Sequence, residues 1–266
     1  MSNIDTEADA LLIESIGRVR VLTINRPHRQ NALTPELLAA LTDAFLDANA
    51  DPDVWVVVLT AVGDRTFCAG MDLKRASGMD GAPTKPFRGP MDQPHRLLFE
   101  VIAETGKPTI CAINGAAVGG GFEMALACDL RIAVENVRFG LPEAKIGMGA
   151  IYASVVLPRM VPVGVALEMM FTGDYMDAES AKHWGLVNRL VPPDRLREEA
   201  IALAQRIAEN APITVRRMKQ MAMKGLSLPI ATALRLDVGP NPYTAADREE
   251  GIRAYLEKRK PEWKGR

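Results

Sequence analysis

The sequence INGAAVGGGFEMALACD occupies residues 113–129, and FGLPE follows at residues 139–143. The apolar run at residues 109–113 predicts a buried strand. Three consecutive glycines come soon after it, and the good helix formers of residues 122–127 then predict a helix. Glycines at a strand-to-helix turn let the backbone approach a bound group closely, and the free amides of the helix start point toward that group. We therefore expect a binding site at this turn.

Two glutamates accompany this arrangement. Glu123 lies in the first turn of the predicted helix, and Pro142, which is preorganised for a first helical position, puts Glu143 at a second helix start. Two carboxylates beside free amides suit proton transfer next to a stabilised oxyanion. The helix dipole alone also favours an acid in a first turn, so each glutamate has a purely structural interpretation as well. The glycine run matches neither a dinucleotide fingerprint nor a phosphate loop.

The composition narrows the class of protein. A chain of 266 residues with 48% hydrophobic content suits one α/β domain with a sizeable core. The 32 basic and 33 acidic residues leave a formal net charge of -1, which argues against nucleic acid or an anionic membrane as a partner. Three cysteines and three histidines without paired spacing argue against a disulfide framework or a metal site. The polar, acidic N-terminal stretch and the absence of a long uncharged apolar run predict a cytoplasmic protein.

Strands and helices alternate along the chain. A hairpin is expected at residues 10–24, a helix after Thr34, and an almost entirely apolar strand at residues 54–60. Residues 77–94 contain three glycines and four prolines and predict an irregular segment. After a further strand at residues 130–134, amphipathic helices are expected at residues 196–210 and 212–223, and a last helix at residues 244–257. Such alternation favours a parallel sheet with right-handed crossovers.

Several motifs together resemble the enoyl-CoA hydratase/isomerase (crotonase) superfamily, in order and over nearly the whole chain. They are Asn25-Arg26-Pro27, Asn31-Ala32-Leu33, Phe67-x-Ala69-Gly70-x-Asp72-Leu73, Asn114-Gly115 with Gly119-Gly120-Gly121-x-Glu123, Cys128-Asp129, Phe139-Gly140-x-Pro142-Glu143 and Phe171-Thr172-Gly173. The resemblance implies an α/β fold, a crotonase-like spiral of repeated ββα units. It divides the chain into a core with the acyl-CoA site at residues 1–195 and a helical C-terminal trimerisation region at residues 196–266.

The resemblance also implies the roles of individual residues. The amides of Ala69 and Gly120 would form the oxyanion hole for a thioester oxygen, while Glu123 and Glu143 would hold a water between them. Glu123 would activate that water for attack at C3, and Glu143 would exchange the proton at C2. The remaining expected substrate or CoA contacts are Arg26, Cys68, Gly70, Asp72, Leu73, Gly119, Pro142, Gly147 and Tyr152. Residues 77–94 would form a variable rim over the acyl group.

The chain departs from the family pattern after Glu143. Hydratases of this family usually carry a Gly-x-x-Pro-Gly-x-Gly-Gly-like run there, whereas this chain keeps Gly147 and then reads MGAIYAS at residues 148–154. Two interpretations of Tyr152 stay open: it fills space left elsewhere, or it makes a polar contact with an unusual acyl group.

The resemblance favours an enoyl-CoA hydratase, because isomerases of this family often keep only the glutamate that matches Glu143. The alternatives are a Δ3-Δ2 enoyl-CoA isomerase, a dehydratase of an unusual acyl-CoA and a catalytically idle CoA-binding homologue. No cofactor is expected, since CoA arrives as part of the substrate, and no metal is expected. The expected partners are the acyl-CoA and other copies of the chain, in a homotrimer or homohexamer.

Overall fold

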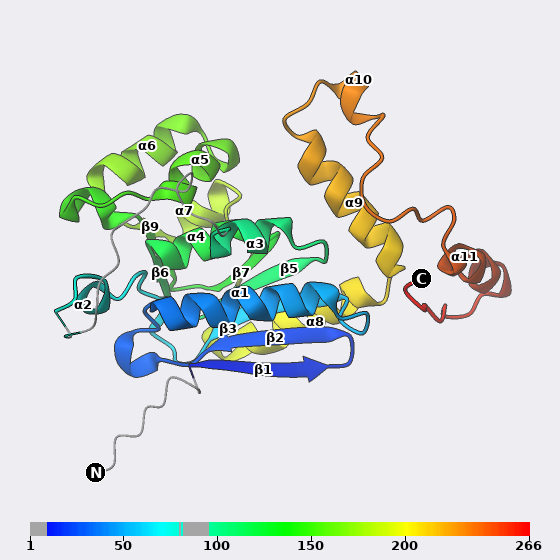
Figure 1. Ribbon diagram of the computed structural model, residues 1–266, viewed down its shortest axis with the longest axis horizontal. Coiled ribbons are helices and arrows are strands. Elements are labelled where there is room, and N and C mark those ends of the chain that lie inside the picture. The colour runs from blue at the N-terminus through cyan, green and yellow to red at the C-terminus, as the bar shows by residue number, and fades with distance from the viewer. Residues whose placement is uncertain (1–9, 80, 82–95) are drawn as a thin grey trace, which may run out of the picture.

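The strands form two sheets in the computed structural model, which describes residues 10–79, 81 and 96–266 (Figure 1). The larger sheet has the order β1-β2-β3-β5-β7-β10, with strands Leu11–Ile16, Val19–Ile24, Val56–Ala61, Thr109–Ile113, Leu130–Val134 and Arg189–Val191. The smaller sheet has the order β4-β6-β8-β9, with strands Thr66–Cys68, Ala116–Val118, Arg138–Gly140 and Met176–Asp177. In both sheets the described strands are parallel, except that β1 is antiparallel to β2 and β9 is antiparallel to β8.

Helices connect and cover these strands. The α-helices are α1 Pro35–Ala50, α2 Leu73–Ala76, α3 Leu98–Glu104, α4 Gly120–Ala127, α5 Ile151–Met160, α6 Val163–Thr172, α7 Ala178–His183, α8 Leu196–Ala208, α9 Pro212–Gly225, α10 Ile230–Ala233 and α11 Ala246–Glu257. Short 3-10 helices are η2 Pro27–Arg29, η4 Pro142–Ile146 and η5 Pro193–Arg195. The predicted helix start at Thr34 is confirmed, because its hydroxyl accepts a hydrogen bond from the amide of Leu37 at 3.2 Å. Pro142 begins a helix as predicted, although that helix is 3-10.

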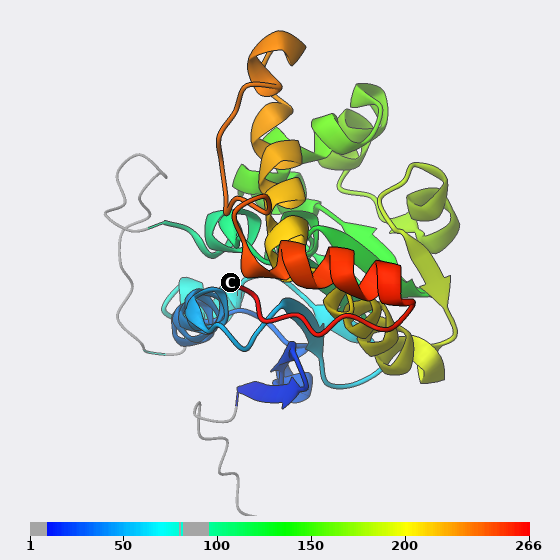
Figure 2. The same cartoon turned by 90° about the vertical axis from the view of Figure 1, so that its right-hand side faces the viewer.

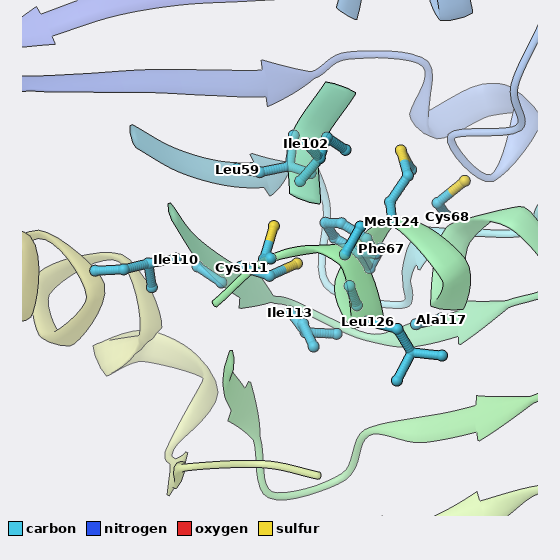
Figure 3. Packing of buried hydrophobic residues seen from close by; sticks show 14 of the residues in the cluster. Leu59, Phe67, Cys68, Ile102, Ile110, Cys111, Ile113, Ala117, Met124 and Leu126 are labelled. Carbon is cyan, nitrogen blue, oxygen red and sulfur yellow. The ribbon is translucent and has the colours of Figure 1, made fainter. Parts of the chain in front are cut away.

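The larger sheet forms the centre of the hydrophobic core. All five residues of β5 are buried, as are five of the six in β3, which explains their continuous apolar sequences. Helix α1 contacts β1 and β2, and α8 packs on β2, β3, β5 and β7. Figure 2 shows these two helices on opposite sides of the sheet. Leu59 of β3 and Cys111 of β5 belong to the same buried cluster as Phe67 of β4 and Met124 of α4 (Figure 3). The predicted α/β architecture of parallel strands and crossover helices is confirmed.

The C-terminal helices α9 to α11 extend away from the two sheets (Figures 1 and 2). An ion pair of 2.7 Å between Lys219 and Asp129 ties α9 to the loop before β7. The carboxylate of Asp247 on α11 accepts the amides of Lys264 and Gly265 at 2.7 and 2.8 Å, which folds the last residues back along this helix. The predicted boundary at residues 195–196 stays a prediction; α8, which follows it directly, packs against the sheet.

The expected irregular segment at residues 77–94 lies mostly outside the described residues. At its start, α2 ends at Ala76 and is followed by a turn. Among the described residues, no helix is both long and apolar enough to cross a membrane.

Helix α4 and strand β4 approach each other at Gly121. A Cβ added to Gly121 would stand 2.3 Å from the carbonyl oxygen of Cys68, far inside van der Waals contact. Because the obstacle is backbone, the strand itself would have to move. This glycine therefore sets the distance between the two segments.

We expect Gly121→Ala to lower the free energy of unfolding by about 3 kcal/mol or more, since overpacking against backbone cannot be relieved by a rotamer change. Thermal unfolding followed by circular dichroism measures the effect. Gly164→Ala is the matched control: it adds the same methyl group inside α6, where nothing lies within 4 Å. The control should be neutral or slightly stabilising, because alanine favours helix over glycine. Equal unfolding temperatures for the two variants would contradict the assigned role of Gly121.

Candidate active site

Three predicted motifs meet at one edge of the smaller sheet. Strands β4, β6 and β8 run parallel, with Cys68 opposite Ala117 and Val118 opposite Gly140. The carboxyl ends of neighbouring parallel strands lie at the same edge, where α/β proteins commonly bind ligands. The chain leaves these ends as residues 69–72, 119–123 and 141–143. Segments far apart in the sequence therefore converge because the strands before them pair in register.

Glu123 is held in place by the start of another helix. Its side chain is 5% exposed, and its Oε1 atom accepts hydrogen bonds from the amides of Tyr152 and Ala153 at 2.8 and 2.9 Å. These amides belong to the first turn of α5, so one carboxylate oxygen caps that helix from outside. The Oε2 atom has no hydrogen-bond partner among the described residues. One oxygen of Glu123 is thus structural, and the other is available for chemistry.

Glu143 stands close to Glu123 and to the glycine turn. Its Oε1 atom would lie 2.8 Å from a Cβ added to Gly119, and its Oε2 atom is buried without a hydrogen-bond partner in the described part of the chain. Burial raises the pKa of Glu143. Burial also raises the pKa of Glu123, and the negative charge of Glu143 raises it further, against the two amides that lower it. The two carboxyl groups therefore lie close enough for the charge of Glu143 to act on Glu123.

The amide of Gly120 is available as an oxyanion donor. It is the first residue of α4, and it has no acceptor in the part of the chain that the structure describes. The amide of Gly119, by contrast, donates to the carbonyl of Gly140 at 2.9 Å. Gly120 N lies 3.4 Å from the position that a Cβ of Gly70 would take, which brings the two glycine motifs into contact.

The second predicted donor, Ala69, needs a correction. Its amide donates to the carbonyl of Gln30 at 3.1 Å, so this N–H is already engaged. Gly70 then adopts a φ of +86°, which turns the backbone, and the amides on either side of Met71 are also engaged: Gly70 donates to Cys68 Sγ, and Asp72 donates to the Leu33 carbonyl. The amide of Met71 itself has no acceptor among the described residues. A turn at a positive-φ glycine cannot be placed from sequence alone, which is why Met71 was missed.

The other predicted contacts have different surroundings. Arg26 and Asp72 form an ion pair of 3.8 Å, and Arg26 also donates to the carbonyl of Ala32 at 2.5 Å. These interactions connect the loops that contain the three residues. Cys68 is fully buried, and burial raises its pKa to about 12, so it is a packing residue without a free surface toward a substrate. Leu73 is exposed at the start of α2, and Gly147 ends η4 with a φ of +67°. Pro142 opens η4 and thereby orients Glu143.

Phe99 is a site residue that the sequence analysis did not single out. Its Cζ atom lies 3.7 Å from where a Cβ of Gly120 would stand, and its ring centroid is 5.7 Å from that of Tyr152. Leu33 Cδ1 approaches the same point at 3.2 Å. An apolar wall therefore lies beside the Gly120 amide. Its members come from distant segments, so only their packing could reveal it.

A groove of about 270 Å³ lies elsewhere, between β1 and α1, where Thr34, Glu36 and Asp43 are among its lining residues. It contains none of the predicted site residues. The interacting carboxyls of Glu123 and Glu143 lie at the strand ends instead, beside the glycine turn. No group of three or more side chains able to hold a metal ion is found in the described ranges.

A model of the enoyl-CoA hydratase/isomerase family matches residues 14–266. The chain belongs to this family. Among curated members of the enoyl-CoA hydratase/isomerase family, an (E)-benzylidenesuccinyl-CoA hydratase of Thauera aromatica is 39% identical, over 95% of this chain and 98% of its own length. A crotonyl-CoA hydratase of Syntrophomonas wolfei is 36% identical, over 94% and 96%. A carnitinyl-CoA dehydratase of Salmonella typhi is 37% identical, over 97% and 100%.

Solved structures agree with this family assignment. An enoyl-CoA hydratase from Bacillus anthracis superposes with a TM-score of 0.86 at 34% identity and covers 97% of this chain and 100% of its own. One from Mycobacterium tuberculosis gives a TM-score of 0.85 at 34% identity, with 97% and 99% coverage. The predicted membership of the enoyl-CoA hydratase/isomerase family and the predicted crotonase-like α/β fold are therefore confirmed.

The two raised pKa values make stability depend on pH. A carboxyl whose pKa is higher in the folded than in the unfolded state binds its proton more tightly when folded. Its contribution to the stability of the folded state is therefore most favourable below the ordinary glutamate pKa of about 4.3. This contribution is lost as the pH rises through the pKa of the folded state. We expect Glu143→Gln to unfold at a higher temperature than the wild type at pH 8, with a difference that vanishes near pH 4.

Calorimetric unfolding across this pH range measures the difference. Glu135→Gln removes the same charge from an exposed position and serves as the control. The increase in unfolding temperature caused by Glu143→Gln should differ between pH 4 and pH 8 and should exceed that of the control. An increase that is the same at both pH values, or equal to that of the control, would contradict the assignment of a buried carboxylate.

Proposed function

We propose that the protein is an enoyl-CoA hydratase, which reversibly adds water across the 2,3 double bond of an enoyl-CoA thioester. The observation that carries this proposal is that two interacting carboxyls lie with two amides that have no acceptor among the described residues, at the ends of three parallel strands. Acids supply and remove protons, and the amides stabilise the negative charge that an enolate places on the thioester oxygen. The activities named for the relatives of similar length support it.

The thioester oxygen binds to the amides of Gly120 and Met71 in this mechanism. Both donors are main-chain groups fixed by the surrounding turns, so they need no rearrangement as charge develops. Loss of one such donor costs on the order of 3 kcal/mol in transition-state stabilisation. The first turn of α4 adds its own favourable dipole to the Gly120 donor. Polarisation of the thioester makes C3 electrophilic.

Water is held between Glu123 and Glu143. As the water oxygen attacks C3, one of its protons passes to the free Oε2 of Glu123, and the carboxylic acid of Glu143 delivers a proton to C2. The product gains one water in total, and a proton returns from Glu123 to Glu143 to close the cycle. The raised pKa of Glu143 keeps part of it protonated closer to neutrality, as a proton donor requires.

The same geometry distinguishes this reaction from the isomerase alternative. A double-bond shift moves a proton between C2 and C4 and needs no carboxylate for water. Glu123 has one oxygen without a partner among the described residues, and it interacts with the charge of Glu143, which is the arrangement that a water nucleophile needs. Dehydration of a 3-hydroxyacyl-CoA is the reverse of the proposed reaction and uses the same groups. No added cofactor or metal takes part in the proposed steps, because CoA arrives with the substrate.

We expect the wild type to hydrate crotonyl-CoA and both Glu123→Gln and Glu143→Gln to lower kcat by about a thousandfold or more, since general acid–base groups each contribute about 10² to 10⁴ and the pair acts as a unit. Loss of enone absorbance follows the reaction. The exposed Glu135→Gln is the matched control and should keep wild-type rates.

Exchange of the C2 proton with deuterium oxide separates the two roles. It should be abolished in Glu143→Gln and should persist in part in Glu123→Gln. Full hydration by Glu123→Gln, with loss only in Glu143→Gln, would contradict the assignment of Glu123 as the base that activates water. Unchanged rates in both variants would exclude the proposed site.

We also propose that copies of the chain associate through helices α9 to α11, as a homotrimer or homohexamer. This region exposes many large apolar side chains: Met218, Met223, Leu226, Ile230, Leu234, Ile252, Tyr255 and Leu256. Exposed apolar patches of this kind are typical of surfaces that associate. The family resemblance suggests the number of copies.

Light scattering should give three or six times the mass of one chain. Leu234→Lys and Leu226→Lys together should shift the mass toward the monomer, because charges replace two of the most exposed apolar side chains of the region. Arg138→Lys, on β8 away from these helices, is a conservative control. A monomeric wild type would contradict the assembly without affecting the proposed chemistry.

A further inference from the structure

Helix α4 carries both the Gly120 amide and Glu123, and its N-terminal end is fixed where Gly121 packs on the carbonyl of Cys68. All eight residues of the helix are buried. The amide of Gly120 points along the helix axis, as amides of an α-helix do. A tilt of α4 about the contact at Gly121 therefore turns this N–H while moving it little. The direction of the donor consequently depends on what holds the opposite end of α4.

A buried arginine holds that opposite end. Arg131 of β7 is 4% exposed, and its Nη1 atom donates to the carbonyls of Ala125 and Cys128 at 3.1 and 2.7 Å. These two residues lie in the last turn and at the C-cap of α4, where carbonyls have no partner inside the helix. The helix dipole also favours a cation there. The Nε atom of Arg131 donates to the carbonyl of Leu186 at 2.5 Å, which ties α4 to the segment before β10.

A lysine of the C-terminal helices reaches the same end. Lys219 of α9 forms its ion pair of 2.7 Å with Asp129, the residue that follows the C-cap of α4. The two side chains are only 10% and 21% exposed, so salt and water screen this pair less than a pair on the surface. Asp129 also accepts the amide of Thr109 at 2.7 Å, and Lys219 donates to the carbonyl of Lys107 at 2.9 Å. The chain that leaves α4 is therefore fixed to α9 as well as to β5.

We propose that Arg131 and Lys219 are positioning residues, which together fix the C-terminal end of α4 and thereby aim the Gly120 N–H at the thioester oxygen. This inference rests on the proposed hydratase function and deepens it. Glu123 has its own support at the start of α5, so loosening the far end of α4 affects the oxyanion donor first. A hydrogen bond weakens steeply when its angle becomes poor. Because the negative charge on the oxygen develops in the transition state, such a loss lowers kcat more than it raises KM.

We expect Lys219→Met to lower kcat for crotonyl-CoA by about threefold or more, and Arg131→Lys by about tenfold or more, with KM within about twofold of the wild type. Lysine keeps the charge of Arg131 and loses the planar fork of N–H groups that reaches several carbonyls. Loss of enone absorbance follows hydration. The matched controls are Lys224→Met, at an exposed position of α9, and Arg20→Lys, on β2 of the larger sheet. Both controls should keep wild-type rates.

A spectroscopic measurement separates positioning from a general loss of structure. Butanoyl-CoA labelled with ¹³C at its carbonyl has no double bond to hydrate, and infrared spectroscopy measures how far its C=O stretching frequency falls on binding. Hydrogen bonds to the thioester oxygen lower this frequency, because they polarise the C=O bond. We expect a smaller downshift in Lys219→Met and Arg131→Lys than in the wild type and the two controls. Circular dichroism and the mass from light scattering should be unchanged.

The outcomes distinguish this inference from the proposed function. A wild-type kcat and downshift in either folded variant would overturn the inference, as would a fall in kcat with an unchanged downshift. If Arg131→Lys does not fold, Lys219→Met, which changes a side chain where α9 meets the core, decides by the same two measurements. Absence of the downshift in the wild type would also overturn the inference, and hydration by that wild type would leave the proposed function in place. Lack of hydration of every enoyl-CoA would overturn the proposed function, while a downshift that Lys219→Met reduces would still support the positioning role.

Discussion

The close approach of Gly121 to the carbonyl of Cys68 is the constraint on which the rest of the site depends. It lets α4 begin directly against the end of β4, so that the amide of Gly120 and the turn at Gly70 face the same point. Any side chain at residue 121 would separate the two segments. Because β4, β6 and β8 pair in parallel, η4 and its Glu143 begin at the same edge of the smaller sheet. Catalytic geometry here follows from the packing of backbone on backbone.

Glu123 shows how stability and chemistry share one side chain. Its Oε1 atom satisfies two amides at the start of α5, which offsets part of the cost of burying the carboxylate. Its Oε2 atom has no hydrogen-bond partner among the described residues. Burial and the charge of Glu143 raise the pKa of Glu123, the two amides lower it, and the net shift is upward. Replacement of this residue therefore removes the partner of a helix terminus as well as a carboxyl with a raised pKa.

Much of this arrangement could be predicted from the sequence. Local sequence patterns were sufficient to predict features that depend on neighbouring residues alone. These are the helix cap at Thr34, the buried strands β3 and β5, and the helix start at Pro142. Ordered motifs were sufficient to predict the family. Prediction was wrong at Ala69, because the direction of each amide depends on the φ of +86° at Gly70 and on the isolated β-bridge between Leu33 and Met71. Phe99 was missed because its role arises from contacts between segments, which no single stretch contains.

Glu123 is bound by main-chain amides of residues 152 and 153, and this has a consequence for how such an enzyme diversifies. Every amino acid except proline supplies the same amide, so the side chain at residue 152 can vary while the bond to the acid is retained. A substitution at residue 152 can therefore replace the ring that packs on Phe99 while the main-chain anchor of the buried carboxylate stays the same. The backbone thus separates the requirement of the acid from the identity of the neighbouring side chain.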